Sequence, residues 1–190
     1  MILIACSPQA SACTPVTTRD VAQVEKRVEA IRVETQRIDA INDEPPSAPF
    51  RELARSLPHW EFSGRFHDSN PSFLTARFTE GQVVREESYY LHDAKLRLVR
   101  VETWWDVDDE SQAPEPPTRQ EYFVESDRII RSVSEVSSSP PITRTDDSAL
   151  PAASLVERSR SIVAILLGGA PDAARMDALA VFTGPRPSQR

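Results

Sequence analysis

The chain has 190 residues, a formal net charge of −7 and a pI near 5.1. This length suits one domain that buries a core without disulfides. The acidic balance argues against nucleic-acid binding, which needs a basic face to displace counterions from phosphates. No apolar run reaches the roughly 18 residues that a transmembrane helix requires. The glycine motifs of the common nucleotide-binding sites are absent as well.

The first 17 residues are predicted to form a leader and a flexible tether. Residues 3–6, LIAC, resemble the recognition site of bacterial lipoproteins, in which an aliphatic, any and a small residue precede the cysteine that is lipidated. The resemblance implies lipidation of Cys6 and a periplasmic, membrane-anchored protein. Because only five residues precede Cys6, it also requires a signal encoded upstream of Met1. The alternative is a cytoplasmic protein in which the match arises by chance.

An amphipathic helix is predicted over residues 18–41, where apolar residues recur at spacings of three and four. The stripe consists of Val21, Val24, Val28, Ile31, Thr35 and Ile38. A parallel coiled-coil dimer through this stripe would oppose like charges, Arg27 with Arg32 and Glu34 with Asp39. The stripe is therefore expected to pack against the chain's own sheet.

An antiparallel meander of five to six strands is expected in the middle of the chain. A short helix is predicted first over residues 50–57, where four apolar residues fall at helical spacing. Alternating patterns then predict strands over residues 59–66, 73–79, 83–91, 95–107, 119–125 and 128–136. The connections between most of these strands are short and polar, which is typical of hairpins.

The C-terminal part is predicted to be helical. Residues 137–141 are expected to leave the sheet, and a helix follows over residues 149–167 with Gly168 as its cap. A last short helix is predicted over residues 172–182. The domain organisation is therefore a leader over 1–17, one α+β domain over 18–183 and a loose tail over 184–190.

Two hairpins repeat at a separation of 33 residues, YYL-HDA-KL at 89–96 and YFV-ESD-RI at 122–129. Each has two aromatic residues and an aliphatic one, a polar turn, then a basic and an aliphatic residue. This cadence, between an amphipathic helix and a C-terminal helix, is similar to that of uncharacterised secreted proteins and lipoproteins of bacteria. The resemblance covers residues 20–168 and implies no catalytic residue.

Trp104 is the predicted centre of a binding surface. Because side chains alternate across a strand, Trp104 and Trp105 face opposite sides of the sheet. One side carries the apolar set Val99, Val101, Thr103, Trp105 and Val107, which is expected beneath the helices. The other side places Trp104 with Arg100 and Glu102. Trp104 is then either a rim residue covered by a loop or part of a surface that binds a partner, for which Trp and Arg are typical anchors.

No catalytic pattern is found. The serines include no GxSxG elbow, and the histidines and cysteines lack metal-ligand spacing. The adjacent carboxylates of Glu86 and Glu87 are expected to point apart. We therefore expect no enzyme activity, no cofactor and no metal site.

Together these patterns predict an α+β fold with an N-terminal amphipathic helix, the β-meander and C-terminal helices packed on one face. The leading hypothesis is a non-enzymatic cell-envelope lipoprotein that binds an envelope protein or a cell-wall component through a sheet face. The competing class is a cavity-forming protein, with a curved sheet of the cystatin or nuclear-transport-factor type, that binds or converts a small molecule. A cytosolic interaction module is the third.

Overall fold

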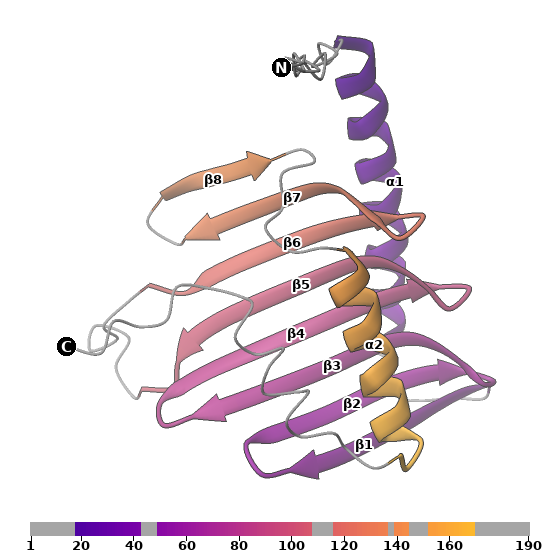
Figure 1. The fold of residues 1–190 in the computed structure, drawn as a ribbon, viewed down its shortest axis with the longest axis vertical. Helices are drawn as coiled ribbons and strands as arrows, with labels where there is room; N and C mark the ends of the chain where they lie inside the picture. Colours follow the sequence, from indigo (N-terminus) through magenta and orange to yellow (C-terminus); the bar gives the residue numbers. More distant parts are fainter. Residues whose placement is uncertain (1–17, 43–48, 108–115, 137–138, 145–151, 170–190) are drawn as a thin grey trace, which may run out of the picture.

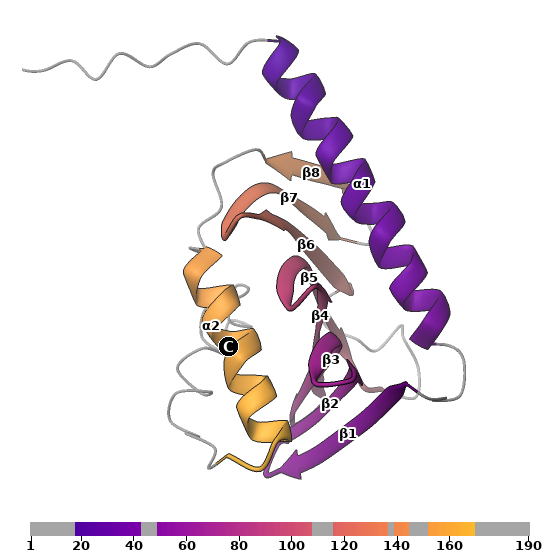
Figure 2. The same ribbon diagram turned by 90° about the vertical axis from the view of Figure 1, so that its right-hand side faces the viewer.

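The structure is a computed structural model that describes residues 18–42, 49–107, 116–136, 139–144 and 152–169. The eight strands of the described chain form one antiparallel sheet and are paired in chain order (Figure 1). The elements are α1 (Thr18–Asn42), β1 (Phe50–Leu57), β2 (Trp60–His67), β3 (Asn70–Glu80), β4 (Val83–His92), β5 (Lys95–Trp105), β6 (Thr118–Glu125), β7 (Arg128–Val136), β8 (Ser139–Arg144) and α2 (Ala152–Leu166). Figure 2 shows the sheet between the two helices, with α1 on one face and α2 on the other.

The α+β class and the antiparallel meander predicted from the sequence are confirmed, as are the N-terminal helix and the helix before Gly168. The predicted number of five to six strands is wrong, because the described sheet has eight. The leader, the helix expected over 172–182 and the tail over 184–190 lie outside the described residues.

β1 occupies the segment for which the sequence predicts a short helix. The helical spacing depends on four residues, Phe50, Leu53, Ala54 and Leu57. In the structure this segment is an edge strand that pairs with β2 along its whole length. Leu53, Arg55 and Leu57 are half-buried, while the residues between them are exposed. Arg55 donates to the carbonyl oxygens of Ile165 (2.9 Å) and Gly169 (3.0 Å) at the end of α2, and strand alternation places Arg55 on the side of Leu53 that faces α2.

β8 occupies a segment that was expected to leave the sheet. Residues Ser139–Arg144 pair with β7, although Pro140 and Pro141 lie within them. Proline cannot donate to a strand ladder, so it is tolerated in an edge strand, which has a neighbour on one side only. The register shifts between Ser134 and Val136 of β7. Pro140 and Pro141 are therefore compatible with a strand at the edge of the sheet. They do not show that the chain leaves the sheet before them.

The two repeated hairpins turn through residues with positive φ. Asp93 and Ala94 have φ values of 49° and 58°, and Ser126 and Asp127 have values of 50° and 58°. Positive φ at both central residues is typical of the type I′ turn, whose twist matches that of the flanking strands. The two predicted hairpins are confirmed. Their turns adopt this conformation without the usual glycine because the pairing of the flanking strands stabilises it.

α1 packs its apolar stripe against the sheet, as predicted. Val28 and Ile31 are fully buried in a core that includes Tyr90, Leu98, Phe123 and Val133. At its N-terminal end α1 extends past β8 (Figure 1), and there Val21 is 42% exposed. α1 therefore covers only part of this face of the sheet. The strand ends beyond the helix are not covered by it.

α2 covers the other face and forms the larger core. Its residues Leu155, Ile162, Ile165 and Leu166 pack on buried residues of β2 to β7, which include Phe62, Leu74, Tyr89, Val99, Val101 and Tyr122. Val99 and Val101 thus lie beneath α2, as predicted, whereas α1 covers the opposite face and not the one that carries this apolar set. Trp105, from the same expected apolar set, is half-buried at the strand end and lies outside this core.

The C-terminal end of α2 is fixed by two glycines. Gly168 has a φ of 92°, its amide donates to the Ile165 carbonyl (3.1 Å), and the Gly169 amide donates to the Ala164 carbonyl (2.8 Å). This is the Schellman arrangement, and it confirms the predicted cap. A third glycine, Gly64 of β2, lies beneath this end of the helix. A Cβ atom on Gly64 would be 2.8 Å from Leu166 Cδ1, so its absence allows the helix to approach the sheet closely.

Candidate binding sites on the two faces of the sheet

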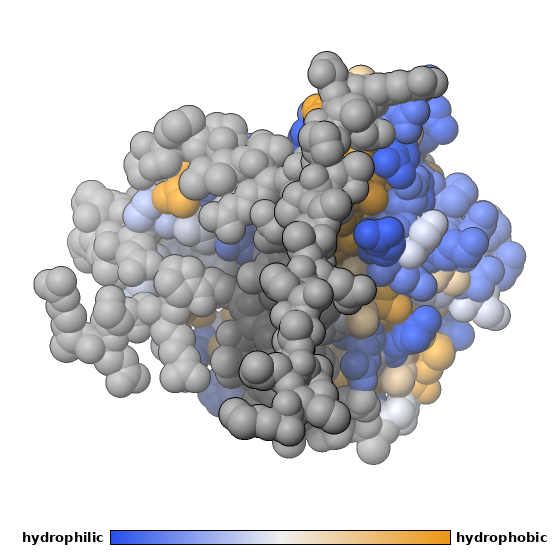
Figure 3. Space-filling model, turned by 45° about the horizontal axis from the view of Figure 1, so that its top comes forward, coloured by the Kyte–Doolittle hydropathy of each residue, from blue (hydrophilic) through white to orange (hydrophobic). Residues whose placement is uncertain are grey.

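The face covered by α1 carries a series of ion pairs between the helix and the strand ends. Arg131 donates two hydrogen bonds to the Glu25 carboxylate, and Arg27 lies 2.7 Å from Glu125. Figure 3 shows hydrophilic side chains on the described surface around α1 and the neighbouring turns. In each pair one side chain is well exposed, 44% for Arg27 and 51% for Glu25, so solvent screens the interaction and each pair adds little stability. They fix where the helix lies on the sheet.

The structure places Arg100, Glu102 and Trp104 on the α1 face of β5. Arg100 lies beside the helix, where its Nη1 donates to the Tyr90 hydroxyl (2.8 Å) and its Nε to Glu121 (3.2 Å). Glu102 and Trp104 lie farther along β5, where α1 does not cover the strand, and both are half-exposed. The structure therefore brings the three predicted residues onto one face but gives Arg100 partners within the helix–sheet contact.

Beyond α1, a row of charged residues crosses five strands in register. The row consists of Arg77, Glu86, Glu102, Arg119 and Glu135 on β3 to β7. We call this row, together with Trp104, the open strip. All six side chains are partly or fully exposed. The open strip is thus a band of alternating and paired charges at the end of the α1 face.

The open strip contains a like-charged pair. Glu86 and Glu102 are directly opposite each other on β4 and β5, an arrangement that destabilises a sheet. Arg77, the register neighbour of Glu86, places its guanidinium over the Trp104 ring, with Cζ 5.8 Å from the ring centroid. Glu86 makes no ion pair within the described part of the chain, and Glu102 lies 3.9 Å from Arg119 with both side chains 41% exposed. Two carboxylates are therefore available beside an aromatic ring.

The face covered by α2 carries a buried ion cluster. Glu87, 1% exposed, accepts two hydrogen bonds from Arg85 (3.0 and 2.7 Å) and one from the Tyr89 hydroxyl (2.7 Å). Arg158 of α2, 4% exposed, donates to both oxygens of the same carboxylate through Nε and through Nη2 (3.0 Å). We call Arg85, Glu87, Tyr89 and Arg158 the Glu87 cluster. Strand alternation places its three β4 members on one face.

The surroundings set the protonation of the Glu87 cluster. Burial opposes ionisation of Glu87, but the Arg158 and Arg85 guanidiniums outweigh it and lower the pKa of the carboxyl from its ordinary value. Burial and the neighbouring Glu87 charge raise the pKa of the Tyr89 hydroxyl well above its ordinary range. Burial acts against the charge of Arg158, yet Glu87 raises the pKa of that guanidinium. The cluster therefore holds an ionised carboxylate, two guanidiniums and a neutral tyrosine.

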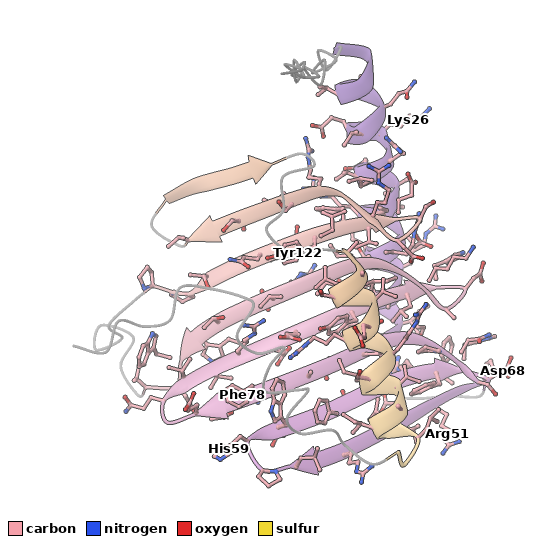
Figure 4. The ribbon with its side chains drawn as sticks, viewed as in Figure 1. Lys26, Arg51, His59, Asp68, Phe78 and Tyr122 are labelled. Carbon is pink, nitrogen blue, oxygen red and sulfur yellow. The ribbon has the colours of Figure 1, made fainter. Side chains whose placement is uncertain are left out.

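Aromatic rings surround the helix side of this cluster. The Arg158 guanidinium lies over Trp60, with Cζ 5.2 Å from the ring centroid. Trp60 stacks on Phe62 with centroids 5.6 Å apart and is 4.8 Å from Phe78. Figure 4 labels Phe78 near His59 of the β1–β2 turn, and the two ring centroids are 6.4 Å apart. The buried charges thus lie against an apolar, aromatic layer.

Sequence reasoning expected Glu86 and Glu87 to point apart, and the structure confirms this: Glu86 lies on the α1 face and Glu87 on the α2 face. The Glu87 cluster itself was missed. Its signals are a charged residue, Arg158, within the apolar stripe of the last helix, and the alternation of Arg85, Glu87 and Tyr89. Nothing in the sequence joins two segments 71 residues apart.

No protein-family model, no curated protein and no solved structure matches the chain. Within the described ranges, no group of three or more His, Cys, Asp and Glu side chains is placed to hold a metal ion. None of the described helices is both long and apolar enough to span a bilayer. Cys6 lies outside the described residues, so its lipidation stays a prediction, as does the resemblance to lipoproteins.

Proposed function

We propose that this protein is a non-enzymatic lipoprotein of the cell envelope, anchored through Cys6, whose open strip binds a basic segment of a partner protein. The observation that carries the proposal is the like-charged pair Glu86 and Glu102 beside Trp104. A pair that weakens the sheet on its own is relieved when a cation lies between the two carboxylates. The pair therefore suits an incoming Lys or Arg side chain.

The chemistry of the partner follows from the composition of the open strip. Trp104 offers a half-exposed ring on which an apolar or cationic side chain can pack, and tryptophan is a frequent anchor of protein interfaces. The net charge of −7 attracts a basic partner over longer distances and raises the rate of encounter. Arg119 lies between Glu102 and Glu135 in the row and disfavours a uniformly basic surface, so the basic segment of the partner is expected to include an acidic residue as well.

The anchor is tested by expressing the native gene, with its upstream codons, in its own host and measuring the mass of the N-terminal peptide. A diacylglycerol-modified Cys6 is the expected result. An unmodified chain that begins at Met1 would overturn the lipoprotein part of the proposal and return the protein to the cytoplasm. The binding part would then be tested on its own.

The open strip is tested with a photo-cross-linking residue, p-benzoylphenylalanine, placed at the position of Glu135 in the full chain. Irradiation in the native host is expected to give one major adduct whose mass spectrum identifies a basic segment of a protein. The matched control places the same residue at the position of Ala153, which is exposed on α2 at the opposite face, and is expected to give no such adduct.

The double variant Glu86→Gln and Glu102→Gln tests whether binding depends on the two carboxylates or on other parts of the surface. It keeps the size of both side chains and is expected to remove most of the adduct while the protein stays folded. An adduct that survives both substitutions, or that forms equally from position 153, would overturn the proposed site. An adduct to a cell-wall component would replace the protein partner with the other class expected from the sequence.

A further inference from the structure

Two buried hydrogen-bond donors without an acceptor lie under α2, on two side chains that contact each other. They are Arg158 Nη1 and Trp60 Nε1, and neither has a hydrogen-bond partner in the structure. Arg158 is 4% exposed and Trp60 5% exposed, and the guanidinium lies over the indole ring at 5.2 Å. Unpartnered buried donors are costly and rare in folded proteins. The pairing of two such donors in one place points to an acceptor that binds there.

The Glu87 carboxylate cannot serve as this acceptor. Its two oxygens already receive five hydrogen bonds from Arg85, Tyr89 and Arg158. A carboxylate offers about four lone-pair sites, so none is left for Arg158 Nη1. Other buried donors without partners, Asn42 Nδ2 and Arg131 Nε, lie on α1 and on β7, which α1 contacts through Arg131 and Glu25.

We propose that the layer between α2 and strands β2 to β4 is a binding site for a small organic acid with an apolar body. One carboxylate oxygen of the ligand accepts hydrogen bonds from Arg158 Nη1 and Trp60 Nε1. A carboxylate fits better than an alcohol, because a charge-assisted bond to a guanidinium is about twice as strong as a neutral one. This site goes beyond the proposed function, lies on the opposite face from the open strip and does not depend on it.

The apolar body of the ligand follows from what surrounds the two donors. The Trp60 ring is stacked on Phe62 and in contact with Phe78, and Leu155 and Ile162 of α2 belong to the same core. Small-molecule sites typically combine such an apolar lining with a few polar groups that fix orientation. A fully hydrated ion such as acetate would leave the lining unused. A medium-chain carboxylate therefore matches both parts of the site.

The donors are covered by α2, so the ligand enters when the helix moves away from the sheet. The strands are joined by continuous hydrogen-bonded ladders, whereas α2 is held by side-chain packing and by Arg55 and Arg158. The helix is therefore the element that moves. Binding that waits for such a movement is slower than simple docking.

The test is a titration of the full chain with decanoate, followed by the indole N–H signals of its three tryptophans in heteronuclear NMR. The Trp60 signal is assigned with Trp60→Phe and the Trp104 signal with Trp104→Phe. Decanoate is expected to shift the Trp60 signal saturably and to leave the Trp104 signal, on the other face, in place. Decanol, which has the same chain and no charge, is expected to bind at least tenfold more weakly.

Trp60→Phe is also the matched variant for affinity. It keeps an aromatic ring on Phe62 and removes the indole donor together with the five-membered ring that carries it, so decanoate affinity measured by calorimetry is expected to fall about tenfold. Trp104→Phe is expected to leave the affinity for decanoate unchanged. The proposal is overturned if decanoate produces no saturable shift at Trp60, if decanol binds as tightly, or if Trp60→Phe binds as well as the wild type. The first two outcomes are read on the wild-type protein and do not depend on how the variant folds.

Discussion

The two faces of the sheet use the same arginine–glutamate chemistry in opposite ways. On the α2 face, Glu87 is closed off from water and its partners come from β4 and from a helix far along the chain. On the α1 face, Glu121 accepts from Arg119 (2.7 Å) and Arg100 (3.2 Å) with its side chain 14% exposed. Because solvent screens the second group more than the first, the buried cluster holds α2 on the sheet strongly, while the Glu121 group links β5 and β6 and adds less stability.

The largest expected difference between the faces comes from removing each carboxylate. Glu87→Gln leaves two buried guanidiniums without their charge partner, which costs about 3–5 kcal/mol of the free energy of unfolding. Glu121→Gln, the matched variant on the α1 face, is expected to cost about 1 kcal/mol. Urea unfolding of both variants checks the order. Equal losses would show that the two faces are energetically alike.

The dependence of stability on pH is expected to arise from the α2 face, through Glu87. The pKa of Glu87 is lowered from its ordinary value of 4.5 by Arg158 and Arg85 against the effect of burial. The stability that this shift contributes is therefore fully present above pH 4.5 and is lost as the pH falls through the lowered value. Unfolding free energies of the wild type and Glu87→Gln, measured from pH 7 to pH 3, should converge on the acidic side. Parallel curves would contradict the assignment to Glu87.

A smaller effect is expected where α2 approaches the sheet most closely. Gly64→Ala places a Cβ atom 2.8 Å from Leu166 Cδ1 and 2.8 Å from Leu74 Cδ2, and overpacking of this kind costs about 1–3 kcal/mol. The matched change on the α1 face is Ser63→Ala, which removes a half-buried hydroxyl contact with Thr75 and is expected to cost less than about 1 kcal/mol. Thermal melting of the two variants measures the difference, and a greater loss in Ser63→Ala would overturn it.

The smallest effect is expected at the open strip. Trp104→Ala removes a half-exposed ring whose described ring contact is with Arg77, so the unfolding free energy should fall by no more than about 1 kcal/mol. Trp60→Ala, its counterpart in the core, should cost about 3–5 kcal/mol. Scanning calorimetry compares the two. A large loss in Trp104→Ala would make Trp104 a core residue and remove the proposed binding surface.

The elements whose local pattern agreed with their final packing could be predicted from the sequence. The stripe of α1 and the hairpins around Asp93 and Ser126 show their period clearly, and each depends on contacts close in the chain. β1 could not be predicted in the same way, because four apolar residues at helical spacing also fit a half-buried edge strand. β8 was missed because proline argues against a strand unless the strand is known to lie at an edge.

The residues of the candidate sites also divide into those that a local pattern predicts and those that only the packing reveals. Alternation along β5 correctly places Trp104 with Glu102, since it needs only the order of residues in one strand. The register that puts Glu86 opposite Glu102, and Arg100 beside α1, depends on which strands pair and where the helix crosses them. The Glu87 cluster requires the packing of α2, which no local pattern encodes.

The pairing of every strand with its neighbours in the chain has a consequence for how the protein folds. Every hairpin except β5–β6, which is joined by residues 106–117, needs only a short loop to close, so the entropy lost at each of these steps is small and the sheet can grow one strand at a time. The contact between Glu87 and Arg158 spans 71 residues and closes only when the last helix reaches a largely completed sheet. We expect α2 to dock late, with unfolding beginning by its release. Amides at this end of the chain should then exchange with solvent before those of the central strands.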